Sequence, residues 1–176
     1  LYYKKKLKIK TICVGNIYVG GTGKTPISIE IYKILKKFKI KSVFIKKKRF
    51  SHSDEIKLLS KIGPIISLKS RIKSIEDAQR KKFKCAIFDD GLQDKLLNYD
   101  FKIVCFDKKN FIGNGKLIPA GPLRESLNSL KKYDIIFFNG LEKLEKNIIS
   151  KVKKINNKLK IFETYPIIIN KDTIKK

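Results

Sequence analysis

The sequence predicts an α/β fold in which helices cover both faces of a mainly parallel β-sheet. Short apolar runs rich in Ile, Val and Phe alternate with amphipathic segments along the 176 residues. The runs are apolar throughout, as is typical of strands that are buried on both faces of a sheet. Parallel neighbours need crossover helices between them, which the amphipathic segments supply. A hydrophobic content of 42% excludes a disordered chain.

The apolar runs define the expected strands. They are Thr11–Val14, Ser42–Ile45, Ile65–Leu68, Cys85–Phe88, Ile103–Phe106 and Ile135–Phe138, with possible later strands at Lys160–Thr164 and Ile167–Ile169. Three of these runs contain one cysteine each, at Cys13, Cys85 and Cys105. An odd number of widely separated cysteines indicates reduced core residues of a cytosolic protein rather than disulfides or metal ligands.

The expected helices follow from apolar residues at helical spacing. One set of such residues comprises Ile27, Ile31, Ile34, Leu35 and Phe38. The segment that precedes Tyr133 has the same spacing, and Leu141–Lys154 predicts a further helix. No internal repeat or Gly/Ser linker divides the chain. The run Lys46–Lys48 is predicted to be a solvated face or loop.

The charge of the chain favours anionic partners. Lys plus Arg is 42 and Asp plus Glu is 16, so the formal net charge is 42 − 16 = +26. Only four of the basic residues are arginine. This indicates codon drift rather than a base-reading surface, which would favour the bidentate guanidinium group, and no nucleic-acid partner is expected. The longest uncharged stretch, Thr11–Gly23, is shorter than the roughly 20 apolar residues of a transmembrane helix.

A glycine-rich loop follows the first strand and precedes the first helix. Its sequence is Tyr18-Val19-Gly20-Gly21-Thr22-Gly23-Lys24-Thr25. Glycines allow backbone N–H groups to converge on phosphate oxygens, and the helix N-terminus adds a favourable dipole. We expect Lys24 to reach the β- and γ-phosphates of ATP and Thr25 to give its hydroxyl group to Mg²⁺. The strand, loop and helix together predict a P-loop NTPase-like fold.

Two positions in this loop separate it from related loops. Tyr18 occupies the place of the first glycine in the general P-loop pattern. The deviant loop of the septum-positioning ATPases has a lysine just before the glycine pair, where this chain has Val19. The second position disfavours that ATPase class.

Carboxylates follow the run Cys85–Phe88. A strand-end aspartate beside a phosphate loop holds Mg²⁺ directly or through water, and Asp89 is the candidate for that role. Asp90 is a candidate for binding the substrate or for orienting the turn at Gly91. Asp107 also ends an apolar run, so position alone does not decide between these carboxylates.

A second acidic segment, Ser53-Asp54-Glu55, begins a helix-like stretch. From spacing alone, Ser53 is interpreted as a helix N-cap, and the two carboxylates as residues that the helix dipole stabilises. His52, the only histidine, is interpreted as an exposed loop residue.

Three motifs, taken together, identify a family. They are Val14-Gly15-Asn16 before the glycine loop, Asp89-Asp90-Gly91-Leu92-Gln93, and the block that runs from Gly113 to Glu125 through Pro119-Ala120-Gly121-Pro122-Leu123-Arg124. In order and spacing, over roughly residues 9–140, the sequence closely resembles the tetraacyldisaccharide 4'-kinase family. The last block is the most specific of the three. Position 94 is Asp94, where the family has histidine.

The resemblance implies a kinase of lipid A biosynthesis. Such an enzyme transfers the γ-phosphate of ATP to the 4'-hydroxyl of a tetraacyldisaccharide 1-phosphate, which gives lipid IVA. Its cofactors are ATP and Mg²⁺, and its partners are the acylated disaccharide phosphate lipid and an anionic membrane surface. The expected location is the cytoplasmic face of the bacterial inner membrane, as a peripheral protein.

The same resemblance assigns roles to individual residues. It makes Asp54 the catalytic base and Glu55 a metal-site partner, and it places Asn114 and Arg124 on the lipid-substrate surface. Residues 1–176 would form a single P-loop kinase domain that is partial at both ends relative to the family. The N-terminal membrane helix and the C-terminal lobe of the family are not expected in this chain.

Two other functions stay open at this stage. The first is another P-loop ATPase or small-molecule kinase, which leaves the block 113–125 unexplained. The second is a basic nucleic-acid-binding module, whose binding would be sensitive to salt. The interleaved basic and aromatic residues that would support the second function are not evident.

Overall fold

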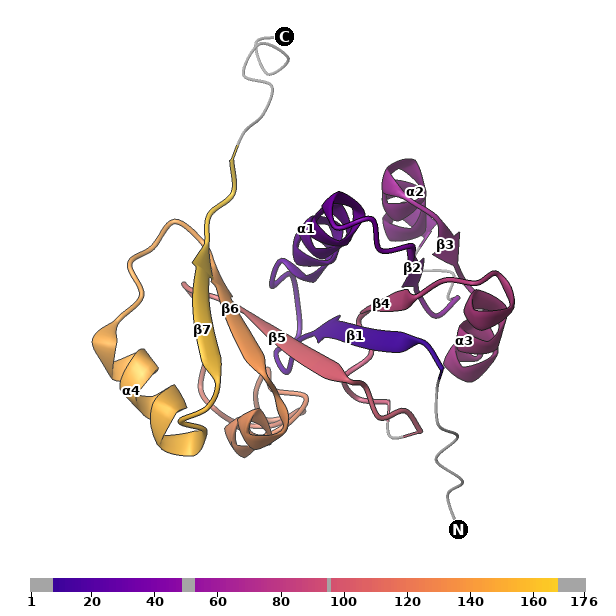
Figure 1. The fold of residues 1–176 in the computed structure, drawn as a ribbon. Helices are drawn as coiled ribbons and strands as arrows, with labels where there is room; N and C mark the ends of the chain where they lie inside the picture. Colours follow the sequence, from indigo (N-terminus) through magenta and orange to yellow (C-terminus); the bar gives the residue numbers. More distant parts are fainter. Residues whose placement is uncertain (1–7, 49–52, 95, 168–176) are drawn as a thin grey trace, which may run out of the picture.

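The computed structural model of the chain describes residues 8–48, 53–94 and 96–167. Its strands are β1 (Lys10–Gly15), β2 (Ser42–Ile45), β3 (Ile65–Ile66), β4 (Cys85–Asp89), β5 (Phe101–Asp107), β6 (Ile135–Asn139) and β7 (Lys160–Thr164). These seven strands form one sheet in the order β3-β2-β4-β1-β5-β6-β7, and every neighbouring pair is parallel (Figure 1).

Helices cover both faces of this sheet. They are α1 (Lys24–Lys37), α2 (Ser53–Ile62), α3 (Arg71–Arg80), the 3₁₀ helix η2 (Leu127–Lys132) and α4 (Lys146–Ile155). Alternation along β4 separates the two layers, because Ile87 packs in a cluster with residues of α1 and α2, whereas Ala86 and Phe88 pack with residues of α3. Figure 1 shows α1 and α2 on one side of the sheet and α3 and α4 on the other. The predicted α/β class with helices on both faces is confirmed.

Most of the predicted strands are confirmed. β2 has the predicted bounds, and β1, β4, β5 and β6 extend the predicted runs by one to three residues in all. The prediction that a strand continues to Leu68 is wrong, because β3 ends at Ile66, at the edge of the described sheet, beside the end of β2 at Ile45. Of the later strands, β7 is confirmed, whereas residues 168 and 169 lie outside the described residues.

The helix predictions need three corrections. α4 begins at Lys146 rather than at Leu141, because Gly140, with φ 135°, and an exposed Leu141 start a loop after β6. The segment before Tyr133 is a short 3₁₀ helix rather than an α-helix. Helix α3 is not predicted at all; its N-cap Ser70 accepts a hydrogen bond from the Lys73 backbone N–H.

The cysteines lie in the core as free thiols. All three are buried and unpaired, as predicted. Burial raises the pKa of Cys85 to about 11 and that of Cys105 to about 12, so both thiols are protonated at neutral pH. Within the described ranges, no helix combines the length and the apolar character that crossing a membrane requires.

Asp100 ties the start of β5 to β1. Its Oδ2 accepts hydrogen bonds from the backbone N–H of Thr11 at 2.9 Å and from the Thr11 hydroxyl at 2.7 Å. Partial burial would raise the pKa of Asp100, but these bonds outweigh burial and hold the pKa below its usual value. The carboxylate therefore stabilises the fold above its ordinary pKa, and this contribution is lost as the pH falls through the folded-state pKa.

We expect Asp100→Asn to lower the free energy of unfolding by about 1 kcal/mol at pH 7, because a charged hydrogen-bond acceptor is lost. The difference from the parent should shrink as the pH falls below about 4. Chemical denaturation at several pH values measures both effects. Glu30→Gln is the control, since Glu30 forms an exposed pair with Lys33 that contributes little. A difference that does not change with pH would contradict this account.

Candidate active site

The glycine loop lies between β1 and α1, as predicted. β1 ends at Gly15 and α1 begins at Lys24, with Gly23 in the N-cap position in a left-handed conformation. Gly20 and Gly21 are exposed, and Lys24 Nζ forms no ion pair or side-chain hydrogen bond with any other described residue. The backbone N–H groups at the helix N-terminus and the Lys24 ammonium group can therefore serve an anionic ligand.

The last turn of the loop is held by Asn139, at the carboxyl end of β6. Asn139 Nδ2 donates a hydrogen bond to Thr22 O at 3.0 Å, and Thr164 Oγ1 donates to Asn139 Oδ1. A Cβ atom on Gly23 would collide with Asn139 Nδ2. Sequence reasoning missed Asn139, although a polar residue directly after the apolar run 135–138 is a signal that could have indicated it.

Asp89 lies at the centre of the site. Its side chain is buried at the carboxyl end of β4, and its Oδ2 accepts hydrogen bonds from Thr25 Oγ1 at 3.1 Å and from Lys46 Nζ at 2.6 Å. Asp89 Oδ1 is buried without a hydrogen-bond partner among the described residues. The structure thus brings together the two candidate metal ligands Thr25 and Asp89. Glu55, the third candidate, lies 2.5 Å from Lys46 Nζ through its Oε2.

Lys46 is the largest correction to the sequence analysis. The prediction that it lies on a solvated face or loop is wrong, because only 2% of the residue is exposed. It directly follows β2, whose neighbour in the sheet is β4, and this brings its ammonium group to Asp89. Burial alone would lower the pKa of Lys46, but the Asp89 and Glu55 carboxylates outweigh burial and raise it above its usual value. Lys46 is therefore charged at neutral pH.

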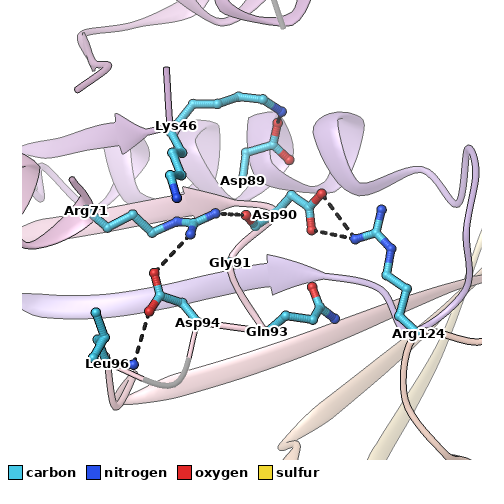
Figure 2. Close-up of a pocket in the computed structure, with 10 residues that line it drawn as sticks. Lys46, Arg71, Asp89, Asp90, Gly91, Gln93, Asp94, Leu96 and Arg124 are labelled. Carbon is cyan, nitrogen blue, oxygen red and sulfur yellow. Dashed lines mark hydrogen bonds and ion pairs between the residues drawn. The ribbon is translucent and has the colours of Figure 1, made fainter. Parts of the chain in front are cut away.

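A cavity of about 570 Å³ opens beside Asp89. Lys46, Lys47, Arg71, Asp89, Asp90, Gly91, Gln93, Asp94, Leu96 and Arg124 line it, and Figure 2 shows this wall. Four cationic and three anionic side chains face one space, so the cavity carries a small positive charge. Such a lining fits a polar ligand with an anionic group.

Two arginines hold the turn after β4. Arg124 Nη1 lies 3.3 Å and 3.4 Å from the two carboxylate oxygens of Asp90, and Arg71 donates to the Asp90 carbonyl oxygen (Figure 2). Asp90 has a φ of 64°, so this pairing supports an uncommon backbone conformation. Arg71 Nη1 also pairs with Asp94 Oδ2 at 3.0 Å. Asp94 therefore neutralises Arg71 in the wall of the cavity.

The block 113–125 is built into the same site. Its Pro122 carbonyl accepts from the Val19 N–H at 2.9 Å, and the Arg124 N–H donates to Ile17 O at 2.7 Å. Gln93 Nε2 donates both to Asn16 O at 2.8 Å and to Glu125 Oε1 at 3.1 Å. The three motifs that lie far apart in the sequence thus meet around one loop.

Asn114 and Asp54 lie outside the lining of this cavity, as do Glu55 and the glycine loop Tyr18–Thr25. Asn114 folds onto its own loop, since its Nδ2 donates to Ala120 O at 2.9 Å and its Oδ1 accepts from the Lys116 N–H at 3.1 Å. Asp54 is exposed in the first turn of α2 and accepts from Ser53 Oγ at 3.4 Å. Ser53 is the first residue of α2 rather than the residue before it, and residue 52 lies outside the described residues. The roles of Asp54 and Asn114 stay predictions.

The oxygen atoms around Asp89 fit a magnesium ion. Within the described part of the chain, no group of three His, Cys, Asp or Glu side chains could hold a metal by itself. Mg²⁺ takes few protein ligands when it is bound together with a nucleotide, and usually keeps waters and phosphate oxygens. The Thr25 hydroxyl and the unpartnered Asp89 Oδ1 supply ligands of that kind.

Comparison of the sequence with known proteins gives consistent matches. The profile of the tetraacyldisaccharide-1-P 4'-kinase family matches residues 1–49 and 46–173. The tetraacyldisaccharide 4'-kinase of Pelagibacter ubique is 49% identical over 169 residues, which cover 96% of this chain and 54% of that protein. The Rickettsia peacockii protein of the same name is 35% identical over 170 residues, which cover 86% and 53%. The chain spans about half the length of these curated relatives.

Solved structures show the same fold. LpxK from Aquifex aeolicus, crystallised in complex with ATP, superposes with a TM-score of 0.65 at 24% identity, over 92% of this chain and 71% of that one. The hydrogenase maturation factor HypB from Archaeoglobus fulgidus superposes with a TM-score of 0.63 at 12% identity, over 90% of this chain and 82% of HypB. These likenesses confirm the predicted P-loop NTPase-like fold.

Gly23→Ala should lower the free energy of unfolding by about 1–3 kcal/mol, because alanine is strained at φ 78° and its Cβ would collide with Asn139. Gly21→Ala is the matched control, since a Cβ on Gly21 has no neighbour within 4 Å and its φ lies outside the left-handed region. Thermal and chemical unfolding of both variants test this expectation. Equal stability of the two variants would show that the packing against Asn139 is unimportant.

Proposed function

The chain belongs to the tetraacyldisaccharide-1-P 4'-kinase family, and from this membership we propose that it binds ATP and phosphorylates the 4'-hydroxyl of a tetraacyldisaccharide 1-phosphate, which gives lipid IVA. The observation that carries the proposal is the pairing of Thr25 with Asp89 beside the loop that the block 113–125 holds. A phosphate-binding loop, an acidic strand end and the family's most specific motif form one site.

The chain's own groups bind the nucleotide. The loop Tyr18–Thr25 receives the phosphates on its backbone N–H groups, and Lys24 supplies a mobile positive charge to the β- and γ-phosphates. Thr25 and Asp89 would hold Mg²⁺, which supplies charge neutralisation at the phosphates when it is bound. The Aquifex aeolicus protein that superposes on this chain was crystallised with ATP, which supports this assignment.

The acceptor occupies the cavity beside Asp89. A second cavity of about 700 Å³ shares Gln93, Asp94 and Arg124 with the first and continues past Asn128 and Lys132. A disaccharide needs an elongated site of this kind, with hydroxyl, amide and charged groups along its wall. Arg124 and the lysines at both ends suit a phosphorylated lipid, and the net charge of +26 suits an anionic bilayer.

Asp54 acts as the base toward the acceptor hydroxyl in this proposal. Phosphoryl transfer depends mainly on charge neutralisation and in-line positioning, so a carboxylate serves chiefly to orient the hydroxyl and to accept its proton late. Asp54 lies in the first turn of α2, next to Glu55, which contacts Lys46 in the cavity wall. This neighbourhood supports the role. The protein would work as a peripheral protein at the cytoplasmic face of the inner membrane.

Another P-loop ATPase or small-molecule kinase is the weaker alternative. The superposition on HypB concerns the fold, at 12% identity. A soluble acceptor would leave unexplained why residues 113–125 carry the most specific motif of the family.

Lys24→Ala should reduce phosphate transfer by at least about 100-fold and weaken ATP binding, because the loop loses its cation. Transfer of labelled phosphate from ATP to the tetraacyldisaccharide 1-phosphate in detergent micelles measures the first effect. Circular dichroism establishes that the variant is folded. Lys33→Ala, in the same helix but paired with Glu30 on its exposed side, should retain parental activity. A folded Lys24→Ala variant with most of its activity would contradict the phosphate-loop assignment.

Asp54→Asn should lower kcat by about 10²–10⁴-fold while ATP affinity stays nearly unchanged. The helix-terminus interpretation predicts instead a small loss of stability, about 0.3–1 kcal/mol, with parental kcat. Turnover, ATP affinity and melting temperature of the variant separate the two interpretations. Parental turnover would show that Asp54 has a structural role only and is not the base.

A further inference from the structure

Lys46 connects three elements of the site through one buried ammonium group. It follows β2, and its Nζ lies 2.6 Å from Asp89 Oδ2 on β4 and 2.5 Å from Glu55 Oε2 on α2. The lysine side chain is 3% exposed and Asp89 is fully buried, whereas 46% of the Glu55 side chain is exposed. A buried ammonium group is stable only where carboxylates pair with it. The contacts of Lys46 with Asp89 and with Glu55 therefore depend on each other.

The ammonium group also selects which Asp89 oxygen stays free. Lys46 and Thr25 both donate to Oδ2, and Oδ1 is left buried without a partner among the described residues. A buried carboxylate oxygen without a donor is unfavourable unless a ligand completes it. Lys46 therefore fixes the rotation of the carboxyl group in the orientation that presents Oδ1.

The first turn of α2 depends on the same contact. Among the residues of α2, Leu59 is buried, and it lies in the second half of the helix. The pair between Lys46 and Glu55 anchors the opposite end, which carries Asp54. Among the described residues, this pair is the ion pair that joins the exposed first turn of α2 to the cavity wall.

We propose that Lys46 is a positioning residue of the phosphoryl-transfer site, which orients the Asp89 carboxylate and sets the place of the first turn of α2. The proposal deepens the function proposed above and rests on it. Lys46 contributes a positive charge beside the ligands that would hold Mg²⁺, so it must weaken the binding of a divalent cation even as it orders the site. Turnover and cation affinity should therefore respond to its loss in opposite directions.

The main test is Lys46→Gln, with Lys48→Gln as the control because Lys48 is exposed. We expect Lys46→Gln to lower kcat for phosphate transfer at least tenfold. The Mg²⁺ concentration for half-maximal binding of a fluorescent ATP analogue should fall about threefold or more. A purely structural role would instead lower kcat and raise the Mg²⁺ concentration needed for half-maximal binding. Lys48→Gln should leave both within twofold of the parent.

Glu55→Gln is the second variant, because Lys46→Gln leaves a buried carboxylate unpaired and can unfold the chain. Glu55 is partly exposed, so its amide variant should fold. This variant should lower kcat, and the backbone amides of residues 55–59 should exchange their hydrogens faster than in the parent. The loss of kcat in the double variant should be smaller than the combined losses of the two single variants, since both residues act through one contact. If Glu55 were a metal ligand instead, Glu55→Gln would raise the Mg²⁺ concentration needed for half-maximal binding of the ATP analogue.

Each outcome decides the inference. Parental kcat in folded Lys46→Gln or Glu55→Gln, a raised Mg²⁺ requirement in either, or additive losses would overturn it. If the parent chain binds the ATP analogue but transfers no phosphate to the lipid, the proposed function fails. The role of Lys46 in the site is then judged by cation affinity and hydrogen exchange alone, with the same expected directions.

Discussion

The buried carboxylate of Asp89 is the constraint on which the site depends. A charge in that position must be paired, because leaving it unpaired in the interior is strongly unfavourable. The strand order β2-β4-β1 places the carboxyl end of β4 between the two strands that lead to Lys46 and to the glycine loop. Thr25 and Lys46 reach Asp89 from opposite sides as a direct result. The parallel sheet thus determines which side chains share the site.

The glycine loop is positioned by contacts from elements far away in the sequence. Asn139 on β6 holds its last turn, and Pro122 and Arg124 hold its beginning through backbone hydrogen bonds. A loop fixed at both ends presents its N–H groups without having to order itself when a phosphate binds. Such preorganisation is what electrostatic stabilisation of phosphoryl transfer requires. In the proposed function, the block 113–125 would therefore contribute to nucleotide binding as well as to the wall of the acceptor cavity.

Local patterns predicted most of the fold and part of the site. Fully apolar strands and the glycine loop have sequence signals of their own, so the sheet and the pair of Thr25 and Asp89 were accessible from the residues. Lys46 was not, because a lysine that begins a lysine run looks solvated until the fold brings Asp89 of β4 and Glu55 of α2 to its ammonium group. Helix α3 was missed because few of its residues are apolar, namely Ile72, Ile75 and Ala78, so its sequence shows only a short apolar stripe. Tertiary contacts decide such cases.

We infer that Thr25 and Asp89 form the metal and phosphate end of a nucleotide site. The most direct measurement is a crystal structure of the chain with Mn²⁺ and a non-hydrolysable ATP analogue, in which anomalous scattering locates the metal. We expect the metal beside Thr25 Oγ1 and Asp89, with the phosphates on the loop Tyr18–Thr25 and the γ-phosphate facing the cavity beside Arg124. Metal bound at Asp107, or phosphates bound away from the loop, would contradict it.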